Sequence, residues 1–570
     1  MHEKLRRSLL RFLTIGAMCI LLNGNGYATD NPLPSKYPDE WGVVFGQTKP
    51  LKEVVFPSIQ HNAFTGFNPG RTIYRKGTVV YEGGPELLCD IIFDRDVSVT
   101  MRDGVKIYID IFRPANSTEK VPAILAYGAY GKGTPRKPLA EMPAGDGDSG
   151  LAKFEAPDPG FYCRHGYAVI NVDSRGTNMS EGDIHYWSSV DAGDGYDLIE
   201  WVAAQDWCNG KVGMGGRSWL GICQWYIAAA QPPHLAAIAP FSAHLYDMYR
   251  KDFAGGVATG FFNKFVTDDL MGKNLREHPW ETFLKFPLMN AYWEDKIAKL
   301  ENIKIPVYSA GGYGTGDLEG ARILMGPQTW LRIQTQPRND DDLLRFYDRY
   351  LKGVENGWET TPRVRLTVMD PGGSSTQINR PEKSWPLSRT VYKPLFLDSS
   401  KGTLSAQPAT SSSTARYDAK EGQAVFTISF QEDTELTGYS KLVLWVEAED
   451  ADDMDIFVSV QKIDFVGNTH NATSGQQRVA VRALDPEKTL SYLPIHSFKK
   501  VERLSAGQIV PVQIAIWPMG MLWHKGEQLV LTIAGDKLGG RMNLRSNNNG
   551  YHIIYTGPQY SSCLQVPLIP

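Results

Sequence analysis

Two hydrophobic patterns alternate along the middle of the chain. Val97–Thr100 and Ile107–Ile111 alternate apolar and polar residues, as half-buried strands do, and Met101–Gly104 between them supplies a turn. Helical periodicity covers Asp194–Ala204 and Leu220–Ala230. Strands that alternate with helices predict a doubly wound α/β sheet over residues 90–385. Its buried parallel strands are predicted at continuous apolar runs: Ala123–Ala126, Ala168–Val172, Val212–Met214, Leu235–Ala239, Ile305–Ser309 and Trp330–Ile333.

The segments around this sheet show other patterns. Residues 29–89 are rich in Pro, Gly and aromatic residues without a clear period, which predicts an irregular N-terminal arm packed on the main domain. Residues 245–300 show no strand pattern and predict a helical insertion, which would cap the ligand crevice at the carboxyl ends of the strands. Asp341–Lys352 reads as an amphipathic helix that ends at Gly353.

A second domain is predicted over residues 390–570. Strand patterns separated by Gly, Asn and Asp turns indicate an all-β sandwich or jelly roll. The strand patterns are Phe426–Phe430, Leu442–Val446, Phe457–Val460, Val510–Ile516 and Leu529–Ile533.

The N-terminus has the layout of a secretory signal peptide over residues 1–28. A basic stretch precedes the apolar run Phe12–Leu22, and Gly26 and Ala28 supply small residues for cleavage after Ala28. The apolar run is about half the ~20 residues that cross a bilayer, so export to the periplasm or medium is favoured over an uncleaved anchor.

Composition narrows the function. The 570 residues are 42% hydrophobic and 21% charged with a net charge of −4, which fits a soluble globular protein and favours neither nucleic acid nor stable membrane insertion. The cysteines after residue 28 form no zinc spacing; an oxidising compartment would allow one disulfide, but free buried thiols are expected for most. These cysteines are Cys89, Cys163, Cys208, Cys223 and Cys563. An acidic cluster at Asp452, Asp453 and Asp455 indicates a turn or solvated face rather than a Ca²⁺ site.

Candidate chemistry lies at Ser218, where a predicted strand meets a predicted helix. A nucleophile elbow needs small residues around the serine, and Gly216 occupies the position two before it. Leu220 stands where the strict G-x-S-x-G pattern has its second glycine, and Gly221 comes one residue later. An incidental serine in a glycine-rich turn is the alternative interpretation.

Several blocks together resemble the family of Xaa-Pro dipeptidyl-peptidases and cocaine-esterase-like acyl hydrolases. The G-x-S-W-x-G elbow with Trp219, Asp173–Gly176 with Ser180–Gly182, and Asp197–Trp201 carry the resemblance, which spans roughly residues 90–570. It implies an α/β-hydrolase core with a helical cap and a C-terminal jelly roll. It also implies an oxyanion hole formed by the backbone N–H of Trp219 and the hydroxyl of Tyr130.

The rest of a catalytic triad is incomplete. The acid should follow the strand at 305–309, where the family position is held by Thr315; Asp317 comes two residues later, and Glu319 is a weaker candidate. The loop after Ile333 contains no histidine, although a serine needs a base to take its proton. His244, after the strand at 235–239, is the best substitute, although a structural cap-boundary histidine is the more ordinary interpretation; His185 is less suitable.

These observations predict an exported serine hydrolase that acts on a small ester or peptide, with no cofactor or metal, and homodimer formation is compatible with the sequence. The missing histidine motivates an alternative, a catalytically impaired family member that acts as a binding protein. A carbohydrate-binding β domain is a weaker third reading, because no specific aromatic pattern supports it.

Overall fold

The protein is described from a computed structural model, which defines residues 37, 41–52, 64–117, 119–133, 149–259, 266–314, 317–333, 340–536 and 543–570. The predicted signal peptide, residues 1–28, lies outside the described residues. Within these ranges, none of the helices has both the length and the apolar character that crossing a bilayer requires.

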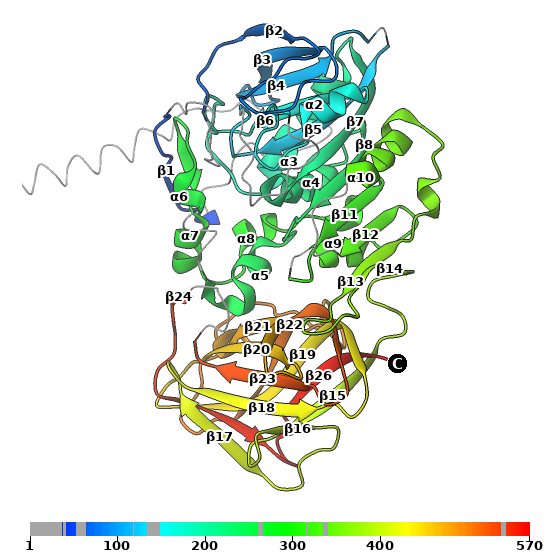
Figure 1. Cartoon of the computed structure of the whole chain (residues 1–570). Helices are drawn as coiled ribbons and strands as arrows, with labels where there is room; N and C mark the ends of the chain where they lie inside the picture. The colour runs from blue at the N-terminus through cyan, green and yellow to red at the C-terminus, as the bar shows by residue number, and fades with distance from the viewer. Residues whose placement is uncertain are drawn as a thin grey trace, which may run out of the picture. The chain divides into compact units, whose positions relative to one another are not determined.

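The first domain is built on an eleven-stranded mixed sheet in the order β14-β13-β12-β11-β8-β7-β5-β6-β4-β3-β2 (Figure 1). Neighbouring strands from β13 to β6 run parallel, whereas β14 at one edge and β4, β3 and β2 at the other pair antiparallel. The strands are β2 Gly70–Tyr74, β3 Ile91–Thr100, β4 Lys106–Pro114, β5 Val121–Gly128, β6 Ala168–Asp173, β7 Cys208–Arg217, β8 Leu235–Phe241, β11 Val307–Gly311, β12 Thr329–Ile333, β13 Val364–Val368 and β14 Gln377–Glu382.

The predicted elements of this domain are confirmed. Every residue of β5 and β6 is buried, as expected for strands covered on both faces. The helices α3 (Ser189–Ala203) and α4 (Ser218–Ala229) contact each other and the central strands. Further helices are α2 (Pro159–Arg164), α9 (Asp317–Leu324) and α10 (Asp340–Tyr347), the last continued by a π-helical turn, Asp348–Lys352, that ends at left-handed Gly353.

Two flanking segments differ from the prediction. The insertion at 245–300 contains short strands as well as helices: β9 (Ala258–Thr259) pairs with β24 (Asn543–Arg545), and β10 (Leu275–Glu277) pairs with β1 (Phe45–Gln47). The N-terminal arm is not wholly irregular either, because it supplies β1 and the edge strand β2. The helices of the insertion are α5 Met248–Asp252, α6 Thr267–Asp269, α7 Pro279–Lys285 and α8 Ala291–Asp295.

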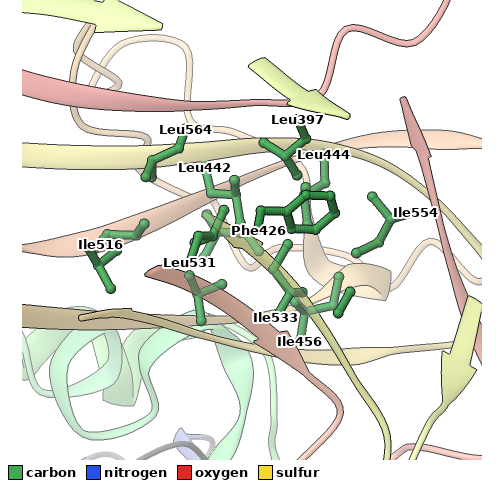
Figure 2. Close-up of a cluster of buried hydrophobic side chains, with 14 of the residues drawn as sticks. Leu397, Phe426, Leu442, Leu444, Ile456, Ile516, Leu531, Ile533, Ile554 and Leu564 are labelled. Carbon is green, nitrogen blue, oxygen red and sulfur yellow. The ribbon is translucent and has the colours of Figure 1, made fainter. Parts of the chain in front are cut away.

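The second domain is all-β, as predicted. Nine of its strands form a closed ring, because β26 pairs with both β15 and β19; β25 and β17 extend the sheet beyond β19. Apolar side chains fill the ring, including Phe426, Leu444 and Ile533 (Figure 2). The strands are β15 Val391–Asp398, β16 Thr403–Ser405, β17 Ser413–Asp418, β18 Gln423–Ser429, β19 Thr434–Glu449, β20 Asp455–Ile463, β21 Thr469–Arg478, β22 Val510–Trp523, β23 Gln528–Ala534, β25 Tyr551–Thr556 and β26 Cys563–Ile569.

Candidate functional site

Ser218 lies in a strained turn between β7 and α4. Its φ is +50°, a left-handed conformation that a non-glycine residue adopts only when its surroundings impose it. The residue is half-buried. Strain at a serine between a central strand and a helix is the backbone geometry that a nucleophile elbow requires.

Close packing explains the glycines around this turn. A Cβ at Gly216 would lie 2.6 Å from Leu220 Cβ, and Gly216 has a φ of +136°. A Cβ at Gly221 would lie 2.7 Å from the carbonyl oxygen of Phe241 at the end of β8. The second small residue is therefore needed three positions after Ser218, where α4 approaches β8, and this accounts for the departure from the strict motif.

Two tyrosines at the end of β5 have different surroundings. The buried Tyr127 hydroxyl donates to Asp191 Oδ1 at 3.1 Å. The ring of Tyr130 instead packs edge-on against Trp219 at 5.5 Å and Phe154 at 5.4 Å. Burial raises the pKa of Tyr130 well above its ordinary value, which keeps its hydroxyl protonated and able to donate. The structure thus places Tyr130, rather than Tyr127, beside the residue that follows Ser218.

A buried charge network holds the loop that carries Tyr130. Lys132 Nζ binds Asp96 and lies 3.1 Å from Asp110 Oδ1, while its backbone N–H donates to Asp173 Oδ1. Burial opposes the charge on Lys132, but the carboxylates of Asp110, Asp173 and Asp96 outweigh it and raise the lysine pKa. Burial also raises the pKa of Asp173 to about 6. The partners of Lys132 are 22 to 41 positions away in the sequence, so no local pattern predicts this network.

Asp317 begins α9 and is fully buried. Its Oδ1 accepts a hydrogen bond of 2.7 Å from the backbone N–H of Ala243, so it ties the loop after β11 to the loop after β8. Glu319, the weaker candidate for the acid, forms an ion pair instead, because its Oε1 lies 3.1 Å from Lys251 Nζ. Thr315, which holds the family's acid position, lies outside the described residues.

His244 lies in the loop that Asp317 anchors. Its ring meets Trp187 edge-on at 6.2 Å, and Trp187 packs on Trp219 at 4.7 Å. Its Nε2 lies 3.9 Å from Asp252 Oδ1, and 28% of its side chain is exposed. The Trp187 ring therefore lies between His244 and Trp219, and His244 is at the same end of the sheet as Ser218.

His185 has a structural role instead. Its Nδ1 lies 2.8 Å from Glu277 Oε1 in a fully buried cluster, where Glu277 also binds Lys296. The loop that should carry the triad histidine, residues 334–339, lies outside the described residues.

An aromatic wall behind Trp219 escaped the sequence analysis. Tyr186 and Trp187 are completely buried and pack on Trp219 at 4.5 and 4.7 Å. Both residues are adjacent in the sequence His185-Tyr186-Trp187, but no local pattern predicts that they pack on Trp219. These buried rings pack behind Trp219 and hold it in place beside Ser218.

The structure also describes the five cysteines and the acidic cluster that the sequence analysis singled out. The five cysteines after residue 28 are free thiols. The acidic cluster is not a solvated face, because Asp453 and Asp455 are buried: Asp453 binds Arg478 at 2.8 Å, and Asp455 accepts from the Asn547 backbone N–H at 2.8 Å. The described residues contain no group of three His, Cys, Asp or Glu side chains that could hold a metal ion.

Comparisons with known proteins agree on one family. Residues 103–266 match the model of the X-Pro dipeptidyl-peptidase (S15 family), and residues 356–565 match its C-terminal non-catalytic domain. A CocE/NonD family hydrolase from Staphylococcus aureus has 31% identity and a TM-score of 0.79, covering 88% of this chain and 97% of its own. An aminopeptidase from a Thaumarchaeota archaeon, 14% identical with a TM-score of 0.66 over 84% and 97%, shares the fold. Cocaine esterase from Rhodococcus is 26% identical over 54% of this chain, but only 62% of the esterase's length is spanned.

Proposed function

Because the chain belongs to the CocE/NonD family of hydrolases, we propose that it hydrolyses an ester or amide bond through Ser218. The observation that carries the proposal is the left-handed φ of Ser218 at the junction of β7 and α4, beside Tyr130 and Trp219. The relatives indicate the class of reaction, and the strained turn indicates Ser218 as the nucleophile.

In the proposed mechanism the Ser218 oxygen attacks the substrate carbonyl while His244 takes its proton. The oxygen of the tetrahedral intermediate accepts hydrogen bonds from the Trp219 backbone N–H and the Tyr130 hydroxyl. Collapse breaks the bond to the leaving group, which takes the proton from His244. Water then attacks the acyl-serine by the reverse steps and releases the carboxylic acid. Asp317 acts as a positioning residue, since it binds the backbone next to His244.

An acyl ester and a dipeptide with a free amino terminus are both candidate substrates of this class of reaction. Recognition of a substrate ammonium requires a carboxylate near the acyl group. Glu319 is already neutralised by Lys251 at 3.1 Å, but the Glu155 carboxylate lies close enough to Tyr130 to contribute to the rise in its pKa.

The second candidate function is binding without efficient turnover. Its support is the sequence of residues 334–340, which contains no histidine where an α/β hydrolase places its base. A protein of this kind would keep the aromatic wall and the oxyanion donors but would acylate slowly.

Covalent labelling distinguishes the two functions. We expect a fluorophosphonate to modify the full chain on Ser218, identified by mass spectrometry of the labelled peptide. We expect His244→Gln to slow labelling about 100-fold, in line with loss of a general base. The matched control is His234→Gln, because His234 is half-exposed and paired with Glu200 at 2.7 Å. Labelling that is absent, or equally fast in both variants, would contradict His244 as the base.

Export is also proposed, on the layout of residues 1–28. Expression of the full chain in a bacterial host should give a periplasmic or secreted product whose first residue is Thr29. An intact N-terminus in the cytoplasm would contradict export.

A further inference from the structure

A cavity of about 360 Å³ lies where the α/β domain meets the β domain. Its walls come from α5, α9 and residues 297–301 on one side and from β19 to β22 and residues 488–498 on the other. Among the described residues, the lining includes none of the five predicted catalytic side chains. This volume is in the range of small-molecule binding sites, so the chemistry of the lining side chains determines which ligand the cavity could bind.

Two cations of the lining are already paired. Lys251 Nζ lies 3.1 Å from Glu319 Oε1 and 4.2 Å above the ring of Trp517. Arg250 binds Asp247 and donates from Nη2 to the carbonyl of His496 at 3.3 Å, which links the two domains. The carboxylates of Asp247 and Glu319 are therefore already neutralised by Arg250 and Lys251.

Arg322 on α9 is a third cation of the lining, and the other two charged residues there, Glu301 and Lys488, are exposed. Its Nε is buried and has no hydrogen-bond partner within the described part of the chain. Glu319, one helical turn before it, is shared with Lys251. The lining holds four cations, Arg250, Lys251, Arg322 and Lys488, and three carboxylates, Asp247, Glu301 and Glu319, which leaves one positive charge. A buried guanidinium N–H without a partner costs free energy until an acceptor reaches it.

His496 offers a complementary group on the opposite wall. The residue is 4% exposed, and its Nε2 has no partner among the described residues. Burial lowers the pKa of His496 to about 4, while a hydrogen bond to the Gln513 backbone opposes the shift. The ring is therefore neutral near pH 7, and donation of its N–H to the Gln513 carbonyl leaves Nε2 as an acceptor.

We propose that this cavity binds a small aromatic carboxylic acid that also carries a hydroxyl or N–H group. The carboxylate pairs with Arg322, the ring lies among apolar walls that include Trp517 and Phe498, and the donor group faces His496 Nε2. The proposal does not depend on catalysis by Ser218, because it rests on a different set of side chains.

The test measures binding of three probes to the full chain by isothermal titration calorimetry: 4-hydroxyphenylacetate, its neutral amide, and phenylacetate. We expect the hydroxy acid to bind at least tenfold more tightly than the amide and severalfold more tightly than phenylacetate. Arg322→Met should weaken the acid at least tenfold and leave the amide unchanged. Arg345→Met is the matched control and should change neither, because Arg345 is a partly exposed residue of α10 that donates to the Gly357 carbonyl and does not line the cavity.

Equal affinity for acid and amide, or unchanged affinity in Arg322→Met, would overturn the proposal, as would absence of binding. If Arg322→Met does not fold, judged by its thermal transition, Ala515→Phe provides the second test. Ala515 lines the same cavity, so the added ring should fill it and abolish acid binding. Retained binding in Ala515→Phe would place the acid elsewhere and overturn the assignment.

Discussion

Tyr127 at the end of β5 and Tyr130 three residues later have different surroundings, which indicate a structural role for Tyr127 and a catalytic role for Tyr130. Tyr127 is hydrogen-bonded to Asp191 in the core, whereas Tyr130 packs on Trp219 beside Ser218. The same substitution at the two positions should therefore change different properties of the protein.

We expect Tyr130→Phe to lower kcat for an ester about 100- to 1000-fold with little change in thermal stability, because it removes only an oxyanion donor. Tyr127→Phe should leave kcat within severalfold but lower the free energy of unfolding by about 2 kcal/mol, because a buried carboxyl loses a partner. Steady-state kinetics and chemical denaturation of both variants test this. Equal kcat values for the two variants would remove Tyr130 from the oxyanion hole.

The junction of β7 and α4 shows how an element imposes strain on one residue. Gly216→Ala would place a Cβ 2.6 Å from Leu220 Cβ at a φ of +136°. We expect a loss of about 3 kcal/mol in the free energy of unfolding, together with loss of esterase activity.

Gly210→Ala, in the same strand, is the control for this change. Gly210 has a φ of +84°, but no atom lies within 4 Å of an added Cβ, so only about 1 kcal/mol of backbone strain is expected. Denaturation curves for the two variants measure the difference. Equal stability would mean that close packing does not constrain the elbow.

The β domain contains a buried histidine that should make stability depend on pH. His552 in β25 contacts Tyr417 and Asn548, and burial lowers its pKa to about 4 from an ordinary 6.5. Its ring is neutral in the folded state, while the unfolded chain takes up a proton below about pH 6.5. The contribution is therefore fully present above pH 6.5 and is lost as the pH falls toward 4.

The size of this loss is on the order of 3 kcal/mol. Chemical denaturation of the wild type between pH 7.5 and 4.5 should show it. His552→Gln should reduce the dependence, because glutamine does not titrate, and the rest should come from His496, whose pKa burial also lowers to about 4. An identical pH dependence in the variant would contradict the assignment to His552.

Sequence patterns predicted the elements whose signal is local. The strands β5 to β8 appear as continuous apolar runs because both faces are buried, and Ser218 stands out because its glycine neighbours are adjacent in sequence. The strands β9 and β10 were missed, since two or three residues cannot show a period and their partners are more than 200 positions away. The contacts of Lys132 and Asp317 were hidden for the same reason.

At the scale of the whole molecule, the two domains share one hydrophobic cluster. Tyr313 and Leu318 from the α/β domain belong to it together with Tyr439 and Leu493 from the β domain. The Tyr313 hydroxyl also donates to the Thr367 carbonyl at 2.9 Å, close to where β13 meets β22. The cavity at this junction could not be predicted from the sequence, because its walls come from segments far apart in sequence.

The measurement that tests the central claim most directly is hydrolysis of a nitrophenyl ester by the wild-type chain beside its Ser218→Ala variant. We predict turnover by the wild type and a loss of at least 1000-fold in the variant, with an unchanged thermal transition. Equal rates in the two proteins would contradict Ser218 as the nucleophile, and the binding function would then be the better account.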